Sequence, residues 1–174
     1  HWLKGGQGAI ELAEAVIEAR GGDALPPIEL DLDVAGTRLS GVLDSLWRGG
    51  HVRADAGTRS ERRALDCWIR HLCYSLVAPA GLPGESRLIT RSGGASGPGY
   101  AELVYAAMAP EDAEAELTKL VSLFWGGQQR PLPFFILSAS AYVEEEQKLQ
   151  KKGGLAAPEI HARAFAKANA SWRG

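Results

Sequence analysis

The residues with the clearest chemical meaning surround one carboxylate, Asp44, which follows Gly41-Val42-Leu43 within a predicted strand. A carboxylate at a strand bend can hold a divalent cation together with an acidic-x-Lys sequence on the next strand. In such a site the lysine positions or activates the water that attacks a phosphodiester. An aspartate can equally make a structural hydrogen bond in a turn or hairpin. Residue type therefore leaves two interpretations of Asp44, a metal ligand and a turn contact.

The next predicted strand does not supply the rest of such a metal site. Its sequence at 51–55 is HVRAD, so Arg53 takes the place of the acidic residue and Asp55 takes the place of the lysine. A cation in that place repels a metal ion. The Glu-x-Lys at 146–148 falls in a later predicted helix, where a solvated charged face explains it. We therefore predict no catalytic residue and no bound metal, with Asp44, Arg53 and Asp55 as a vestigial site.

Other catalytic and nucleotide-binding arrangements are missing from the sequence. No serine or cysteine lies in a G-x-S-x-G or comparable frame, and the Gly-rich segment 5–8 has neither a preceding strand nor the Walker lysine-serine ending. Cys67 and Cys73 are six residues apart in one predicted helix, which suits neither a metal site nor a disulfide, so we predict reduced core cysteines. The histidines are scattered without metal-ligand spacing: His1, His51, His71 and His161.

Arginines concentrate around the third predicted strand and the start of the longest predicted helix. The chain as a whole has a net charge of -2, so any attraction to phosphate must be local. Such a zone can bind DNA phosphates or an acidic partner, although Asp55, Glu61 and Asp66 are interleaved and ordinary surface charge is the alternative. The candidate DNA- or partner-binding residues are Arg48, Arg53, Arg59, Arg62, Arg63 and Arg70.

Length and composition predict one globular domain over residues 1–174, because a chain of this length can bury a sizeable core. No apolar run reaches the roughly 20 residues that span a bilayer, and no signal sequence opens the chain. We therefore expect a cytosolic protein that does not act at a membrane. Because the chain begins at His1 rather than Met, we interpret it as a fragment of a longer protein.

Hydrophobic periodicity predicts five helices and five strands. The helices are expected at 9–20, 59–77, 110–125, 138–152 and 158–168, and the strands at 28–34, 37–47, 51–54, 86–90 and 100–106. The first three strands are expected to form a meander, and Gly126-Gly127 to end the third helix. Residues 92–99 are expected to form a mobile Gly/Ser loop. Phe134-Phe135 can be a partner-docking segment or part of the domain's own core.

This order of elements predicts an α/β fold with a mixed sheet flanked by helices and with extra C-terminal helices. The order matches the common core of the restriction-endonuclease-like, or PD-(D/E)XK, nucleases. Asp44 lies on the second predicted strand and Arg53 and Asp55 on the third, which are the strands that carry the metal site of that core.

Several segments together resemble the C-terminal domain of RecC, the gamma subunit of exodeoxyribonuclease V. The resemblance runs from about Ala9 to Tyr142, and its more specific parts are RPLPFFILSASAYVE from Arg130 and RALDCWIRHL from Arg63. The segments AIELAEAVIEARG, IELDLDVAGTRLSGVLDSL and GGHVR add to it. The chain departs from the family at 54–57, where ADAG replaces an aromatic-Arg-Pro-Gly character.

The resemblance implies a fragment of a RecC-like chain, in the three-subunit RecBCD helicase-nuclease that processes double-strand breaks in bacteria before homologous recombination. RecC is understood to be catalytically silent, to scaffold the RecB and RecD subunits, to help split the duplex and to recognise Chi. It implies contacts with RecB, RecD and both double- and single-stranded DNA, in the bacterial cytoplasm. No cofactor is expected for this domain, because ATP and Mg²⁺ are used by the partner subunits.

Three hypotheses follow, and the first is a non-catalytic, nuclease-like domain that scaffolds the complex and guides DNA. The second is an active metal-dependent nuclease of the same fold, with Asp44, alone or together with Asp31, Asp33 or Asp55, as unconventional ligands. The third is a protein-interaction domain that never meets DNA.

Overall fold

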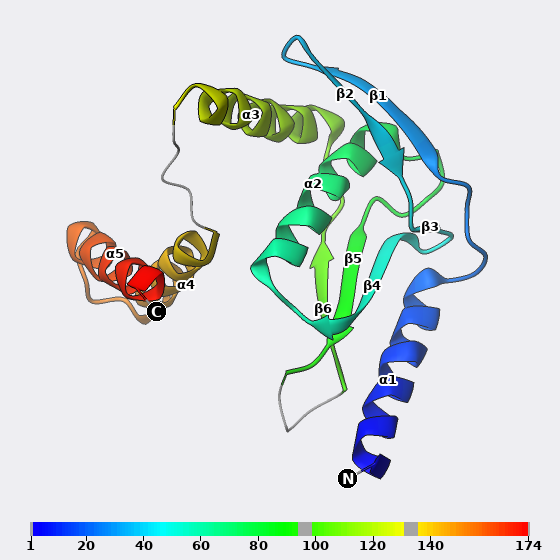
Figure 1. Ribbon diagram of the computed structural model, residues 1–174, viewed down its shortest axis with the longest axis horizontal. Helices are drawn as coiled ribbons and strands as arrows, with labels where there is room; N and C mark the ends of the chain where they lie inside the picture. The colour runs from blue at the N-terminus through cyan, green and yellow to red at the C-terminus, as the bar shows by residue number, and fades with distance from the viewer. Residues whose placement is uncertain (1, 94–98, 131–135, 174) are drawn as a thin grey trace. The chain divides into compact units, whose positions relative to one another are not determined.

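The computed structural model describes residues 2–93, 99–130 and 136–173 and divides into two compact units (Figure 1). The first unit is His1–Gln129 and the second is Arg130–Gly174. The single domain predicted from length stays a prediction, and each unit is described by itself. None of the helices in the described parts of the chain combines the length and the apolar character needed to cross a membrane.

A four-stranded sheet forms the centre of the first unit. Its order is β3 (Leu46–Trp47), β4 (Gly50–Thr58), β5 (Ser86–Arg91) and β6 (Tyr100–Tyr105). β4 and β5 are parallel, whereas β3 and β6 pair antiparallel at the two edges. The predicted mixed sheet is confirmed.

Two helices cover the two faces of this sheet, α1 (Trp2–Arg20) and α2 (Glu61–Val77). Val16 of α1 packs on Val52 and Ile89, while His71 of α2 reaches Ser86. Since Ser86 and Ile89 are three residues apart on β5, and alternate strand residues face opposite sides, the helices lie on opposite faces. The predicted α/β arrangement of a mixed sheet flanked by helices is therefore confirmed. Helix α2 also makes the crossover that joins the parallel strands β4 and β5 (Figure 1).

The predicted strand at 37–47 and the three-strand meander are both wrong. β1 (Ile28–Val34) and β2 (Thr37–Leu43) form a separate two-stranded sheet, and β3 begins only at Leu46. Between them Ser45 has φ 61°, a left-handed conformation that interrupts a strand. The chain therefore leaves one sheet at Leu43 and enters the other at Leu46, with Asp44 in the break.

Helix α3 (Pro110–Gln129) closes a core against α2 and the β1–β2 hairpin. Val34, Leu72 and Leu117 are buried together there. The helix runs through Gly126-Gly127, so the prediction that these glycines end it was wrong. A glycine inside a helix costs only about 1 kcal/mol relative to alanine, which the neighbouring helical residues can tolerate.

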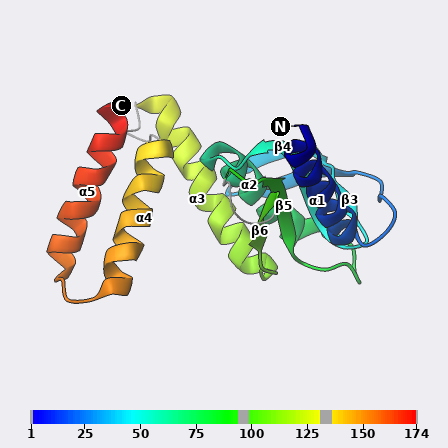
Figure 2. The same ribbon diagram turned by 90° about the horizontal axis from the view of Figure 1, so that it is seen from below.

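The second unit is a hairpin of two antiparallel helices, α4 (Ile136–Lys152) and α5 (Ala157–Arg173), which lie side by side in Figures 1 and 2. Leu149, Ile160 and Ala164 are buried in it. Both helices agree with the predicted ones except at their ends. Phe134 and Phe135 lie outside the described residues, as does most of the predicted loop at 92–99.

Candidate functional site

Asp44 lies exposed in the break between β2 and β3, and its carboxylate faces an arginine of α2. Arg70 Nη1 is 3.4 Å from Asp44 Oδ1, and Ser45 Oγ donates a hydrogen bond of 3.2 Å to the same oxygen. The side chain of Asp44 is 61% exposed. Among the described residues, no three His, Cys, Asp or Glu side chains are grouped so that they could hold a metal ion. Asp44 thus has a guanidinium, rather than further carboxylates, as its neighbour.

Arg53 lies on the face of β4 that α2 covers, and it pairs with Asp66 of that helix. Arg70 reaches the other oxygen of Asp66 at 3.5 Å, so Asp66 lies between two guanidiniums. Arg53 therefore does not pair with Asp44 directly. The four residues form a chain of alternating charge, Asp44, Arg70, Asp66 and Arg53.

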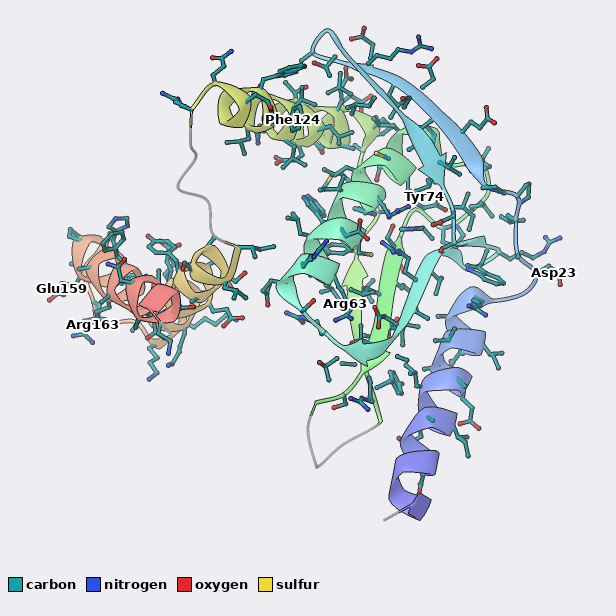
Figure 3. The ribbon with its side chains drawn as sticks, in the orientation of Figure 1. Asp23, Arg63, Tyr74, Phe124, Glu159 and Arg163 are labelled. Atoms are coloured by element: carbon teal, nitrogen blue, oxygen red, sulfur yellow. The ribbon has the colours of Figure 1, made fainter. Side chains whose placement is uncertain are left out.

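Asp55 lies two residues further along β4 and makes a separate set of contacts. Its Oδ1 accepts a 2.7 Å hydrogen bond from the Gly57 amide, and its Oδ2 is 2.5 Å from Nε of Arg63, the arginine of α2 labelled in Figure 3. The Gly57 amide, and then Arg63, hold the pKa of the Asp55 carboxyl below its ordinary value. Arg63 also donates to the Thr58 carbonyl at 2.9 Å, so Asp55 and Arg63 together fasten the end of β4 to the start of α2.

Removing this fastening should lower stability modestly, because both partners are partly exposed. We expect Asp55→Ala to cost about 1 kcal/mol of unfolding free energy, and Asp55→Asn less, since an amide oxygen can still accept from Gly57. Urea denaturation of both variants checks this. Asp31→Ala, which breaks a more exposed pair with Arg38, is the control and should cost less than Asp55→Ala. A stabilising effect of Mn²⁺ that Asp55→Ala abolishes would contradict a purely structural role.

Asp31 and Asp33, the other ligands considered for an active nuclease, are used within the β1–β2 hairpin. Arg38 binds both oxygens of Asp31, with distances of 2.7 and 2.8 Å. Asp33 Oδ1 accepts a 3.0 Å hydrogen bond from the Gly36 amide in the turn. The structure therefore does not bring them together with Asp44, which lies beyond the other end of the hairpin.

The six candidate arginines divide into two groups. Arg53, Arg63 and Arg70 are in the ion pairs described above, whereas Arg48, Arg59 and Arg62 are exposed and make no ion pair with a described residue. Arg91 is also exposed and lies beside Thr58 in the parallel register, at the same end of the sheet as Arg59. Sequence reasoning missed Arg91 because only the pairing of β4 with β5 brings it to that end.

A buried cluster of two histidines and a serine lies under the middle of α2. Ser86 Oγ is 3.0 Å from His51 Nδ1 and 2.9 Å from His71 Nδ1, and all three residues are 0% exposed. Because a hydroxyl has one hydrogen, it donates to one ring and accepts from the other, so the two histidines must hold different tautomers. His71 also stacks on Tyr105, with ring centroids 5.6 Å apart.

Burial makes these histidines neutral and keeps substrate away from the serine. Burial, reinforced by Arg53 and Arg70, lowers the pKa of His51 to about 4, and burial also lowers the pKa of His71. The cluster is therefore structural. The sequence contained one signal for it, since His71 falls on the apolar stripe of the predicted helix, but Ser86 carried none.

The cysteines fit the prediction of reduced core residues. Cys67 and Cys73 are both buried and free. Burial raises the pKa of the Cys67 thiol to about 11, so this side chain stays protonated and unreactive.

Most of the chain is similar to a known protein family. Residues 2–147 match the family model of the RecC C-terminal domain. The chain belongs to this family. The match to the RecC C-terminal domain includes the first unit except for His1 and ends inside α4, so that α5 lies beyond it. No curated protein matches the chain.

Proposed function

We propose that this chain is a non-catalytic, nuclease-like domain of a RecC subunit of exodeoxyribonuclease V. In this role it scaffolds RecB and RecD in a RecBCD-type complex and guides DNA during double-strand break repair and homologous recombination. Membership of the RecC C-terminal domain family supports the assignment to this subunit. The proposed location is the bacterial cytoplasm.

One observation carries the non-catalytic part of the proposal. Arg53 occupies the strand position where a nuclease of this type would hold its second carboxylate, and Arg53 is itself paired with Asp66. Asp44, the first carboxylate, has Arg70 beside it. A guanidinium beside Asp44 and another in the place of the second carboxylate oppose the binding of a divalent cation, which needs several anionic or neutral oxygen ligands.

The order of elements supports a nuclease-like core. A helix precedes the strands, the break at Asp44 comes before β4, and α2 crosses over to the parallel strand β5. The DNA-guiding role would use the exposed arginines at the end of β4 and β5, namely Arg59, Arg62 and Arg91, with Arg48 at the β3–β4 turn. No cofactor is proposed for this domain, since ATP and Mg²⁺ would act in the partner subunits.

The proposal predicts that the 174-residue chain leaves DNA intact. Linear duplex and single-stranded DNA should remain uncut in the presence of Mg²⁺ or Mn²⁺, because no ligand set completes Asp44. Gel analysis measures this, and calorimetric titration with Mn²⁺ should give no specific heat of binding. Metal-dependent cleavage that Asp44→Ala abolishes would overturn the proposal and favour an active nuclease.

A further inference from the structure

The charge of the chain is divided unevenly between its two units. Residues 130–174 contain seven Lys and Arg against four Asp and Glu, a net charge of +3, whereas residues 1–129 contain twelve against seventeen, a net charge of -5. The chain as a whole, at -2, hides this difference. A polyanion that approaches the protein would thus be attracted by the helical hairpin and repelled by the rest.

Contacts between the helices fix which residues share one edge of the hairpin. Tyr142 Oη is 2.5 Å from His161 Nδ1 and 3.3 Å from Glu146 Oε1, so Tyr142, Glu146 and His161 form one edge. Each residue of a helix turns by about 100°. On a helical wheel, Tyr142 and Glu146 lie to one side of the buried Leu149 of α4. His161 lies to the same rotational side of the buried Ile160 and Ala164 of α5, and in antiparallel helices this places all three on one edge.

The basic residues are displaced in the opposite sense and share the other edge. They belong to both helices: Lys148 and Lys152 of α4, and Arg163 and Lys167 of α5. We call this set the basic edge. All four side chains are exposed, and Arg163 is marked on α5 in Figure 3. Arg163 and Lys167 are one turn apart, about 6 Å along the helix axis.

The basic edge is neutralised only in part. Glu159 lies one turn before Arg163 on the same side of α5, but its carboxylate accepts a 3.3 Å hydrogen bond from the Ala156 amide at the start of the helix. Lys148 Nζ lies 3.4 Å from Glu145 Oε2, an exposed pair of the kind that contributes little. Lys152, Arg163 and Lys167 make no ion pair with a described residue. The neighbouring exposed positions of α5 on this side carry the small residues Ala166 and Ala170.

The kind of partner follows from what this edge lacks. A protein partner would need an apolar or aromatic anchor beside the charges. The exposed Val143 and Phe165 are displaced toward the other edge, with Tyr142 and His161, and the exposed Leu137 lies about three helical turns before Lys148. None of these three apolar residues adjoins the four basic ones. A phosphate backbone requires only positive charge and close approach. All four basic residues lie beyond residue 147, where the family match ends.

We propose that the basic edge of the α4–α5 hairpin binds the phosphate backbone of nucleic acid without reading its sequence. This surface is additional to the DNA-guiding residues of the first unit, and it does not depend on them. The four side chains would follow the backbone of a nucleic-acid strand, because each lysine or arginine can neutralise one phosphate.

The test measures binding of the whole 174-residue chain to a fluorescein-labelled 30-nucleotide oligothymidylate by anisotropy, over a range of salt concentrations. The variant Lys152→Ala/Arg163→Ala/Lys167→Ala should weaken binding on the order of tenfold near 50 mM salt. It should also reduce the slope of log K against log salt by about 2, at roughly 0.7 per phosphate contact. Alanine has the highest helix propensity, so the triple variant should keep its helices, and circular dichroism checks this.

The matched control is the neighbouring Lys151, which lies about 100° around α4 from Lys152 and on the side of the helix opposite the buried Leu149. Lys152→Ala should weaken binding more than Lys151→Ala. Equal effects of the two, an unchanged salt slope in the triple variant, or no binding by the unaltered chain would each overturn the proposal. Equally tight binding of poly-glutamate would overturn it too, by showing attraction to any polyanion.

A second set of variants keeps this inference separate from the proposed function. Arg59→Ala/Arg62→Ala/Arg91→Ala removes the same number of charges from the first unit. If this variant binds DNA normally while the hairpin variant does not, the DNA-guiding role of the sheet end fails and the hairpin inference stands. The reverse result supports the sheet end and overturns the hairpin inference.

Discussion

Lowering the pH from about 6.5 to about 4 should remove about 3 kcal/mol of unfolding free energy through His51 alone. His51 is fully buried, and burial lowers its pKa in the folded protein from the ordinary 6.5 to about 4. Between these values the unfolded chain binds a proton at this side chain and the folded chain does not. Acid therefore favours unfolding across this window, and the effect levels off below pH 4, where both states are protonated. His71, whose pKa is also lowered, acts in the same direction.

Other groups do not hide this effect. The carboxyls of Asp31, Asp55 and Asp66 also have lowered pKa values, but their ordinary value is 3.8, so their contribution is lost mainly below the histidine window. Urea denaturation at a series of pH values measures the slope of stability. In His51→Gln that slope should fall by up to about 1.4 kcal/mol per pH unit, the value for one proton.

Leu88→Ala is the matched control for the histidine variant. Leu88 is 4% exposed on β5, so the substitution should cost about 2–5 kcal/mol at every pH without changing the slope. If His51→Gln has the slope of the unaltered protein, the histidine is not the group that titrates, and the explanation from burial is wrong.

The second large effect is expected at Gly49, in the turn between β3 and β4. A Cβ there would overlap the carbonyl oxygen of Ala19 and lie 3.0 Å from the carbonyl carbon of Arg20, at the end of α1. The Gly49 amide also donates a 2.7 Å hydrogen bond to the Arg20 carbonyl. Because the atoms that the Cβ would meet belong to the backbone of α1, no movement of a side chain can relieve the overlap. We expect Gly49→Ala to cost about 3 kcal/mol or more of unfolding free energy.

Gly126→Ala is the control, since nothing lies within 4 Å of a Cβ at Gly126 in helix α3. This substitution should raise stability by about 0.5–1 kcal/mol through helix propensity. Thermal denaturation of both variants should therefore give shifts of opposite sign. A Gly49→Ala protein as stable as the original would show that α1 does not seat against this turn as described.

Elements with strong periodicity were predictable from the sequence, and the break at Asp44 was not. The apolar stripe of α2 and the alternation of β1 each mark one buried face, so their type and position follow from local pattern. Ser45 offers no such mark, because its left-handed conformation is set by the separate pairing of β1–β2 and β3–β4. The prediction at Gly126-Gly127 was wrong for the opposite reason. The glycine pair is a strong local indication of a helix end, but the helix continues through it to Gln129.

For the candidate site, the sequence predicted the inversion of charge at Arg53 and Asp55 but not the partners. Arg53 pairs with Asp66 and Asp55 with Arg63 because α2 crosses the face of β4 on which both side chains lie. Helix position over a sheet is a tertiary property, and no spacing along the chain encodes it directly. The same holds for Ser86, which meets two histidines that are 35 and 15 residues away.

The alternating chain of Asp44, Arg70, Asp66 and Arg53 has a consequence for how such a domain can change over generations. Under the proposed function, regaining hydrolysis would require an acidic residue in place of Arg53. That single substitution would place a new carboxylate beside Asp66. The two like charges would repel each other, and no lysine or metal ion would yet be present to offset the lost stability. Each intermediate would be less stable than its parent and still inactive. The ion pairs thus make the loss of catalysis difficult to reverse, because selection for stable folding alone opposes the substitutions that would restore it.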